Sequence, residues 1–200
     1  MQSTRPNTVT LVLGGVRSGK SHYAQQLGKD AGRVVFVATA EARDDEMRHK
    51  VERHQNTRPA HWQTVEEPLR LAEAILRHGP SCDLMIIDCL TFFAANLLET
   101  GGDDPHSIER SVEDLCLALQ SPPCSVVLVS NEVGSGVVPA YPSGRRFRDL
   151  LGEMNQSVAH VASNAVLLVA GLPLILKGQL EVRPHGEVCS KTEVRPEVSQ

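Results

Sequence analysis

Apolar segments of strand length alternate with segments of helical periodicity along this chain. Five segments rich in Val, Ile and Leu predict strands at residues 8–13, 33–38, 84–88, 125–130 and 165–170. They lack polar alternation, which is typical of strands that are covered on both faces. Helices are predicted between and after them, at residues 20–29, 44–54, 69–77, 91–99, 107–120 and 145–163. This alternation predicts an α/β fold with a mostly parallel sheet flanked by helices.

The last part of the chain predicts a hairpin followed by an extension. Gly171, Leu172 and Pro173 turn the chain after the fifth strand into a short apolar segment at 174–176, which we expect at a sheet edge. Residues 178–200 are polar and contain Pro184 and Pro196. We therefore expect one domain over residues 1–177 and a C-terminal extension over residues 178–200.

Composition narrows the class of protein. The 200 residues suit one domain, and their net charge of −4 comes from intermixed acidic and basic residues. This distribution disfavours a nucleic-acid-binding stripe or a membrane-binding patch. The five cysteines are scattered without a C-x-x-C pair, which indicates buried free thiols in a reducing compartment. Residues 1–7 are polar and the apolar runs are too short to span a bilayer, so we expect a cytoplasmic protein.

A phosphate-binding motif follows the first predicted strand. The G-x-x-x-x-G-K-S pattern consists of Gly14, Gly15, Val16, Arg17, Ser18, Gly19, Lys20 and Ser21. Its glycines let the backbone curl and aim N–H groups at phosphate oxygens, while Lys20 supplies a cation to the β- and γ-phosphates. The next helix points its positive dipole end at the same anion. A glycine-rich turn that merely caps a helix is the alternative, but the strand–loop–helix context favours nucleotide binding.

Asp88 is the candidate metal ligand of the chain. It closes the apolar strand at residues 84–88, where an isolated carboxylate would be costly to bury. Together with the hydroxyl of Ser21 it offers oxygen ligands to Mg²⁺ beside the phosphate loop. The alternative is that Asp88 caps the following helix.

Other polar residues follow the predicted strands, and ligands bind at the carboxyl ends of strands in such sheets. Thr39 and Ala40 follow the second strand, and Asn131 and Glu132 follow the fourth. A carboxylate at Glu66 or Glu67 could accept hydrogen bonds from guanine, although a solvated loop pair is the default explanation of these residues. Glu132 is one candidate base for a substrate hydroxyl.

His54 and a group of arginines leave two interpretations open. His54 shares a helical face with Met47 and Val51, and a histidine in that setting is usually a packed residue rather than a catalyst. Arg145, Arg146 and Arg148 open a predicted helix, where cations oppose the helix dipole. Either an anionic partner or a solvated face explains these arginines.

The motifs together resemble the bifunctional adenosylcobinamide kinase/adenosylcobinamide-phosphate guanylyltransferase family, from about residue 10 to residue 177. Besides the phosphate loop, the matching segments are Asp44-Asp45-Glu46-Met47 with His54, Arg58-Pro59 and Trp62; Asp88-Cys89-Leu90-Thr91 with Asn96-Leu97-Leu98; Val129-Ser130-Asn131-Glu132-Val133-Gly134 with Val138-Pro139; and Gly144-Arg145, Arg148-Asp149, Asn155-Gln156, Gly171-Leu172-Pro173 and Lys177. Many matched segments in one order are more specific than a phosphate loop alone.

This resemblance implies a function in cobalamin biosynthesis. A kinase step would phosphorylate adenosylcobinamide with GTP or ATP, and GMP transfer from GTP through a guanylylated His54 would give adenosylcobinamide-GDP. The resemblance also implies a RecA-like fold, Mg²⁺, a corrinoid substrate and a homo-oligomer, a trimer in the family. The nucleotide contacts carried over, in addition to the phosphate loop, are Ala38, Thr39, Ala40, Gln55, Asn56, Thr57, Arg58, Glu66 and Asp88.

Four other functions are alternatives to this one. The chain could be a single-activity small-molecule kinase with His54 packed, or a nucleotide-sensing module without catalysis. A GTPase switch is disfavoured because no N-K-x-D guanine-binding motif is present. A RecA-like DNA motor is disfavoured by the charge balance.

Overall fold

A seven-stranded sheet forms the centre of the protein, with strand order β3-β2-β4-β5-β1-β6-β7. The structure is a computed structural model that describes residues 6–40, 59–101 and 104–180. The strands are β1 (Val9–Gly14), β2 (Val34–Ala38), β3 (Gln63–Glu66), β4 (Leu84–Asp88), β5 (Ser125–Val129), β6 (Asn164–Val169) and β7 (Leu172–Lys177). All neighbouring strands pair in parallel except β6 and β7, which are antiparallel. The predicted mostly parallel α/β sheet is confirmed.

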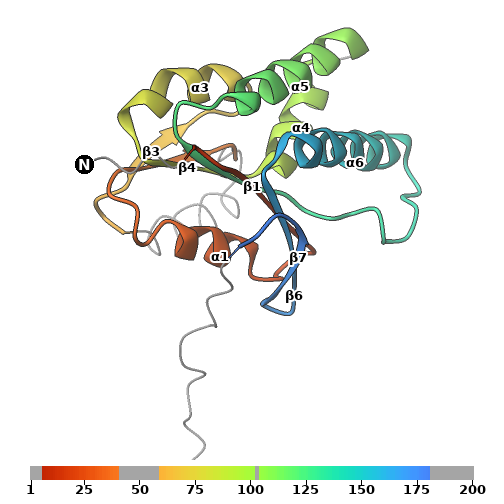
Figure 1. Cartoon of the computed structure of the whole chain (residues 1–200). Helices are drawn as coiled ribbons and strands as arrows, with labels where there is room; N and C mark the ends of the chain where they lie inside the picture. Colours follow the sequence, from red (N-terminus) through yellow and green to blue (C-terminus); the bar gives the residue numbers. More distant parts are fainter. Residues whose placement is uncertain (1–5, 41–58, 102–103, 181–200) are drawn as a thin grey trace, which may run out of the picture.

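Helices cover both faces of this sheet (Figure 1). The described helices are α1 (Lys20–Leu27), α3 (Leu71–His78), α4 (Leu90–Thr100), α5 (Pro105–Gln120) and α6 (Pro142–Val161), with a 3₁₀ turn at Gly79–Ser81. Figure 1 shows α1 on one face and the other four helices on the opposite face. None of the helices in the described part of the chain is long and apolar enough to cross a membrane.

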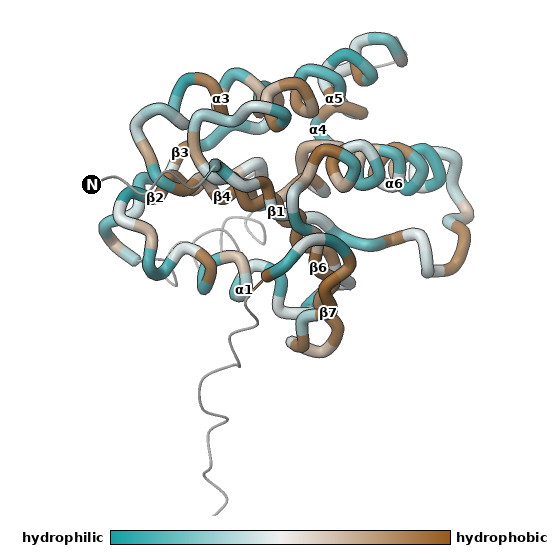
Figure 2. Tube along the Cα trace, in the orientation of Figure 1, coloured by the Kyte–Doolittle hydropathy of each residue, from teal (hydrophilic) through white to brown (hydrophobic). Residues whose placement is uncertain are grey.

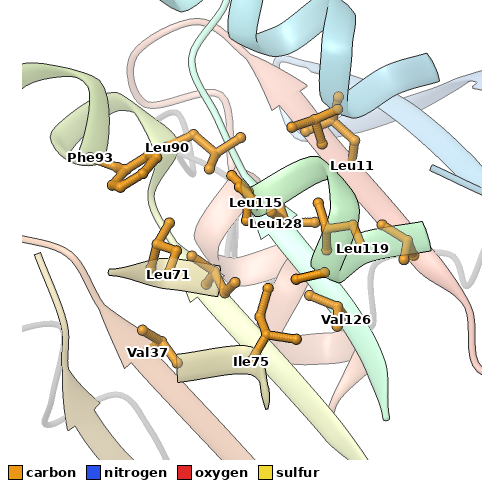
Figure 3. Close-up of a cluster of buried hydrophobic side chains, with 14 of the residues drawn as sticks. Leu11, Val37, Leu71, Ile75, Leu90, Phe93, Leu115, Leu119, Val126 and Leu128 are labelled. Carbon is orange, nitrogen blue, oxygen red and sulfur yellow. The ribbon is translucent and has the colours of Figure 1, made fainter. Parts of the chain in front are cut away.

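Two hydrophobic clusters hold these layers together. The larger one packs α3, α4, α5 and α6 on the sheet through residues such as Leu11, Ile75, Phe93 and Leu128 (Figure 3). The smaller one lies under α1 and includes Tyr23, Phe36, Trp62 and Ile86. Figure 2 shows hydrophobic positions concentrated on the strands and polar positions on the outer turns of the helices. Burial of both strand faces explains why the strand sequences lack polar alternation.

The predicted elements agree with the structure at most positions. The five predicted strands and the hairpin are present, although β7 begins at Leu172, because Ala170 and Gly171 form the turn with φ values of 52° and 82°. Helix α6 begins at Pro142, earlier than predicted. Strand β3 was not predicted, since only Val65 in Gln63–Glu66 is apolar and even that side chain is only partly buried. The predicted helix at residues 44–54 lies outside the described residues, and the boundary at residue 177 stays a prediction.

The strand register brings the carboxyl ends of the central strands to one edge of the sheet. Ala38 is opposite both Glu66 and Asp88, and Asp88 is opposite Val129. The phosphate loop follows β1, which lies between β5 and β6. This edge is therefore where a ligand that touches several strand ends must lie.

Candidate nucleotide-binding site

The phosphate loop connects the end of β1 at Gly14 to the start of α1 at Lys20. Arg17 and Gly19 adopt left-handed conformations, with φ values of 57° and 98°, and the N–H of Ser18 donates to the carbonyl of Gly15 at 3.3 Å. Such alternation of backbone conformation makes a concave group of N–H donors that binds anions. The helix that follows adds its positive dipole end to this loop.

Lys20 is held inside the loop. Its side chain is only 8% exposed, and Nζ donates to the carbonyl oxygen of Gly15 at 2.6 Å. Burial lowers the pKa of Lys20 from its ordinary value, while Cys89 and Asp88 act in the opposite direction. A buried cation gains from an anionic partner, so a bound phosphate would raise the pKa of this amine again.

The turn between β6 and β7 supports the loop from its other side. The N–H of Gly171 donates to the carbonyl of Ser18 at 2.9 Å, and the Cα of Gly171 lies 3.4 Å from where a Cβ would stand on Gly19. Sequence reasoning assigned no role in the site to Gly171. The contact joins positions 18 and 171, so no local pattern could have shown it.

Gly14 tolerates no side chain, which makes a test of the loop geometry possible. A Cβ on Gly14 would lie 2.5 Å from Oγ of Ser18 and 2.6 Å from the carbonyl oxygen of Leu168, at a φ of 153°. We therefore expect Gly14→Ala to lower the free energy of unfolding by about 1–3 kcal/mol, measured by urea denaturation. Gly15→Ala is the matched control, because a Cβ there meets nothing within 4 Å. Equal destabilisation by both variants would contradict this geometry.

Asp88 lies at the end of β4, half-buried, and near enough to Lys20 to favour the charged amine. The N-cap residue of α4 is Cys89, which directly follows Asp88, and the metal role of Asp88 stays a prediction. Burial raises the pKa of the Cys89 thiol to about 11, which keeps it protonated and unreactive at neutral pH.

Thr39 joins the ends of β2 and β4. Its side chain is fully buried, and its hydroxyl both donates to the carbonyl of Cys89 and accepts from the N–H of Cys89, at 2.7 Å each. The buried amide of Asn96 donates to the carbonyls of Thr39 at 2.9 Å and Pro68 at 3.2 Å. These bonds fix the segment that carries Ala38 and Ala40. Nucleotide contacts by Ala38, Thr39 and Ala40, at the end of β2, stay a prediction.

The glutamates differ in their surroundings. Glu66 is exposed at the end of β3, whereas Oε1 of Glu67 accepts from the N–H groups of Leu69 at 3.2 Å and Arg70 at 2.9 Å. Glu67 therefore supports the start of α3. The exposed Glu132 lies beside the phosphate loop, because its N–H donates to the carbonyl of Gly14 at 3.1 Å.

A second buried network fixes the end of β5. The hydroxyl of Ser130 donates to Oδ1 of Asn155 at 2.6 Å, and the amide of Asn155 donates to the carbonyl of Asn131 at 3.0 Å. The N–H of Asn131 donates to Oγ1 of Thr91 at 3.1 Å. Neither Asn155 nor Thr91 was predicted to support the site, since each acts across a long sequence separation.

Arg145 and Arg148, two of the three arginines at the start of α6, have partners within the protein. Nη1 of Arg145 donates to the carbonyl oxygens of Pro139 at 3.0 Å and Ala140 at 2.8 Å. Arg148 lies 3.7 Å from the carboxylate of Asp149. An external anion is therefore not required to explain Arg145 or Arg148.

A family model matches most of the chain that builds this site. The cobinamide kinase/cobinamide phosphate guanyltransferase model matches residues 10–176. The chain belongs to this family. The match spans both sides of the phosphate loop and runs through β7, so the expected family and enzyme class are confirmed.

Curated relatives of the family agree with this assignment. The bifunctional adenosylcobalamin biosynthesis protein CobP of Pseudomonas aeruginosa is 42% identical over 170 residues, covering 84% of this chain and 97% of that protein. The bifunctional adenosylcobalamin biosynthesis protein CobU of Escherichia coli is 39% identical over 178 residues, covering 84% of this chain and 98% of that protein.

Solved structures show the same fold outside the family. An ATPase from the type III secretion system of pathogenic bacteria aligns with a TM-score of 0.51 at 12% identity. The alignment covers 80% of this chain and 50% of the ATPase chain. At this identity the similarity concerns the fold alone, and it agrees with the predicted phosphate-loop architecture. The fold and the family together imply nucleotide substrates.

Several predicted site residues are not described by the structure. His54, Gln55, Asn56, Thr57 and Arg58 lie outside the described residues. The structure brings the phosphate loop, Asp88 and the ends of β2 and β5 to one edge of the sheet. The individual roles of these residues stay predictions.

Proposed function

We propose that this chain phosphorylates the aminopropanol hydroxyl of adenosylcobinamide and then transfers GMP from GTP to the new phosphate, giving adenosylcobinamide-GDP. The observation that carries the proposal is a phosphate loop with a buried lysine in a chain of the cobinamide kinase/cobinamide phosphate guanyltransferase family. We place this reaction in cobalamin biosynthesis in the cytoplasm.

The kinase step needs alignment and charge stabilisation. The corrinoid hydroxyl oxygen attacks the γ-phosphorus of GTP or ATP and gives its proton to a base. The bond from that phosphorus to the β-phosphate oxygen breaks, and a nucleoside diphosphate leaves. Lys20 and the N–H groups of the loop stabilise charge that builds on the phosphate oxygens. The bond from Lys20 to the carbonyl of Gly15 holds the amine within the loop, which aligns it for this step.

The residues at this edge fit a magnesium ion. Ser21 at the start of α1 and Asp88 at the end of β4 offer the hard oxygen ligands that Mg²⁺ prefers. Among the described residues there is no cluster of three or more His, Cys, Asp and Glu that could hold a metal alone. Mg²⁺ commonly takes further ligands from phosphates and water, and it would neutralise phosphate charge when bound.

His54 is the proposed nucleophile of the transfer step. A neutral imidazole nitrogen attacks the α-phosphorus of GTP, the bond to the β-phosphate oxygen breaks, and pyrophosphate leaves. An oxygen of the corrinoid phosphate then attacks the same phosphorus and breaks the nitrogen–phosphorus bond. The ordinary histidine pKa of about 6.5 leaves most of the imidazole neutral at pH 7.5. The covalent intermediate divides one difficult displacement into two easier ones.

We extend the proposal to a homo-oligomer, a trimer as the resemblance implies. Supporting it is an exposed apolar face on edge strand β7, where Leu172, Leu174 and Leu176 are 69%, 56% and 54% exposed. Figure 2 shows this hairpin as a hydrophobic projection from the sheet. A second copy of the chain would cover such a face.

Labelled GTP tests the proposed function directly. Protein incubated with GTP labelled at the α-phosphate should retain label that survives alkali and is lost in acid, as a phosphoramidate does. Addition of adenosylcobinamide phosphate should then move the label into adenosylcobinamide-GDP. Kinase turnover without labelled protein would support a single-activity kinase. GTP binding without either turnover would support a nucleotide-sensing module.

A further inference from the structure

The connection between β5 and α6, residues 130–141, begins beside the phosphate loop and exposes apolar side chains farther along. Val137, Val138 and Tyr141 are 94%, 59% and 77% exposed. Figure 1 shows the connection extending away from the sheet before it turns back into α6, and Figure 2 shows hydrophobic positions on its outer part. Exposed apolar side chains gathered on one connection next to a site indicate a binding surface rather than the scattered apolar exposure of an ordinary surface.

The protein holds this connection at both ends. At its beginning, the N–H of Glu132 donates to the carbonyl of Gly14, and the N–H of Asn131 donates to Oγ1 of Thr91. At its end, Arg145 donates to two carbonyl oxygens, those of Pro139 and Ala140. The apolar side chains are therefore presented by an anchored backbone, which lowers the entropic cost of binding a ligand there.

The charge of the connection distinguishes between the two substrates. Glu132 is the only charged residue in the sequence from 131 to 144, so this stretch offers no cation to a nucleotide. An adenosylcobinamide carries a single net positive charge at its cobalt(III) corrin and is otherwise a large apolar ring with neutral amides. One carboxylate among apolar and small residues complements that molecule.

We propose that residues 132–141 form the docking surface for the corrinoid substrate, with Val137, Val138 and Tyr141 against its apolar parts and Glu132 as the complementary charge. The inference rests on the proposed function, because that function supplies the corrinoid. The contact between Glu132 and Gly14 places the surface next to the loop that holds the triphosphate.

Equilibrium dialysis against adenosylcobinamide, detected by its visible absorbance, tests the apolar part of this surface. The double variant Val137→Ser with Val138→Ser should raise the Kd for adenosylcobinamide about tenfold and leave the Kd for GTP unchanged. The matched control is Leu76→Ser with Leu117→Ser, two exposed leucines on α3 and α5. This control should change neither Kd.

The charge is tested by Glu132→Gln in the same assay. A glutamine oxygen keeps the acceptor that the N–H of Gly134 uses at 2.6 Å, so the turn is preserved while the charge is removed. The Kd for adenosylcobinamide should rise about threefold at low salt, and the difference should disappear at high salt.

The outcomes separate this inference from the proposed function. A parent protein that binds adenosylcobinamide, together with a valine double variant of equal affinity, would overturn the docking surface and leave the proposed function intact. A parent protein that binds GTP but no corrinoid would overturn both. A double variant that changes the sedimentation of the protein, but not its corrinoid affinity, would show that copies of the chain contact each other here and would also overturn the inference.

Discussion

Replacing His54 with alanine should abolish GMP transfer while phosphorylation of adenosylcobinamide remains measurable. The variant loses the proposed attacking nitrogen, so no covalent guanylyl intermediate can form. The kinase step uses the phosphate loop, which is complete without this imidazole. We expect the rate of adenosylcobinamide-GDP formation to fall on the order of a thousandfold or more. Chromatographic separation of adenosylcobinamide phosphate from adenosylcobinamide-GDP measures the two steps in one reaction.

His61→Ala is the matched control for that experiment. His61 is close in sequence and exposed in the structure, and no role in the site is proposed for it. Its variant should carry out both steps at the parent rates. If the His54 variant makes adenosylcobinamide-GDP as fast as the parent, the proposed nucleophile is wrong. A parallel loss in both variants would point to disturbance of the surrounding segment rather than loss of a nucleophile.

The sequence predicts the central sheet well because its strands are buried on both faces. Apolar side chains, mostly Val, Ile and Leu, fill β2, β4 and β5 almost without interruption, and such runs leave few alternatives to a covered parallel strand. Strand β3 has no comparable signal, since three of its four residues are exposed. Its position depends on hydrogen bonds to β2 rather than on burial of its own side chains. Edge strands of this kind need tertiary information to be predicted.

The candidate site, like the sheet, could be predicted from the sequence only in part. The phosphate loop is contiguous in sequence, so its residues and their chemistry could be predicted from the motif alone. The supports of the site are not contiguous: Gly171 bonds to Ser18 in the phosphate loop, Asn96 bonds to Thr39 after β2, and neither pair is close in sequence. A pattern that depends on local spacing cannot show such partners. The resemblance contained the segments with Gly171 and Asn96, but it gave no physical reason for them.

Replacing Lys20 with methionine should damage both reactions, because both build charge on phosphate oxygens held by the same loop. The ammonium group lies 2.6 Å from the carbonyl of Gly15, within the loop itself. Methionine keeps an apolar stem of similar length and removes the cation. We expect kcat/KM to fall about a hundredfold or more for each step, as when one preorganised donor is removed from a transition state. The two products, separated as above, give both values.

The Lys20→Met variant should lose activity without losing stability. Its free energy of unfolding therefore distinguishes a chemical effect from unfolding. Burial lowers the pKa of Lys20, so folding penalises its charged form. Without nucleotide, the Lys20→Met variant should therefore be at least as stable as the parent at neutral pH. As the pH rises through the lowered pKa toward the ordinary value, the parent loses that penalty and the difference should shrink. Urea denaturation between pH 7 and pH 10 measures this difference.

Lys29→Met is the matched control, since this lysine follows the far end of α1 and is exposed. It should leave both reactions and the pH dependence of stability unchanged. A Lys20 variant that loses phosphorylation but transfers GMP at the parent rate would show that the transfer step does not use the phosphate loop. In that case one loop could not serve attack at both the α- and γ-phosphorus, and the two reactions would need separate nucleotide sites.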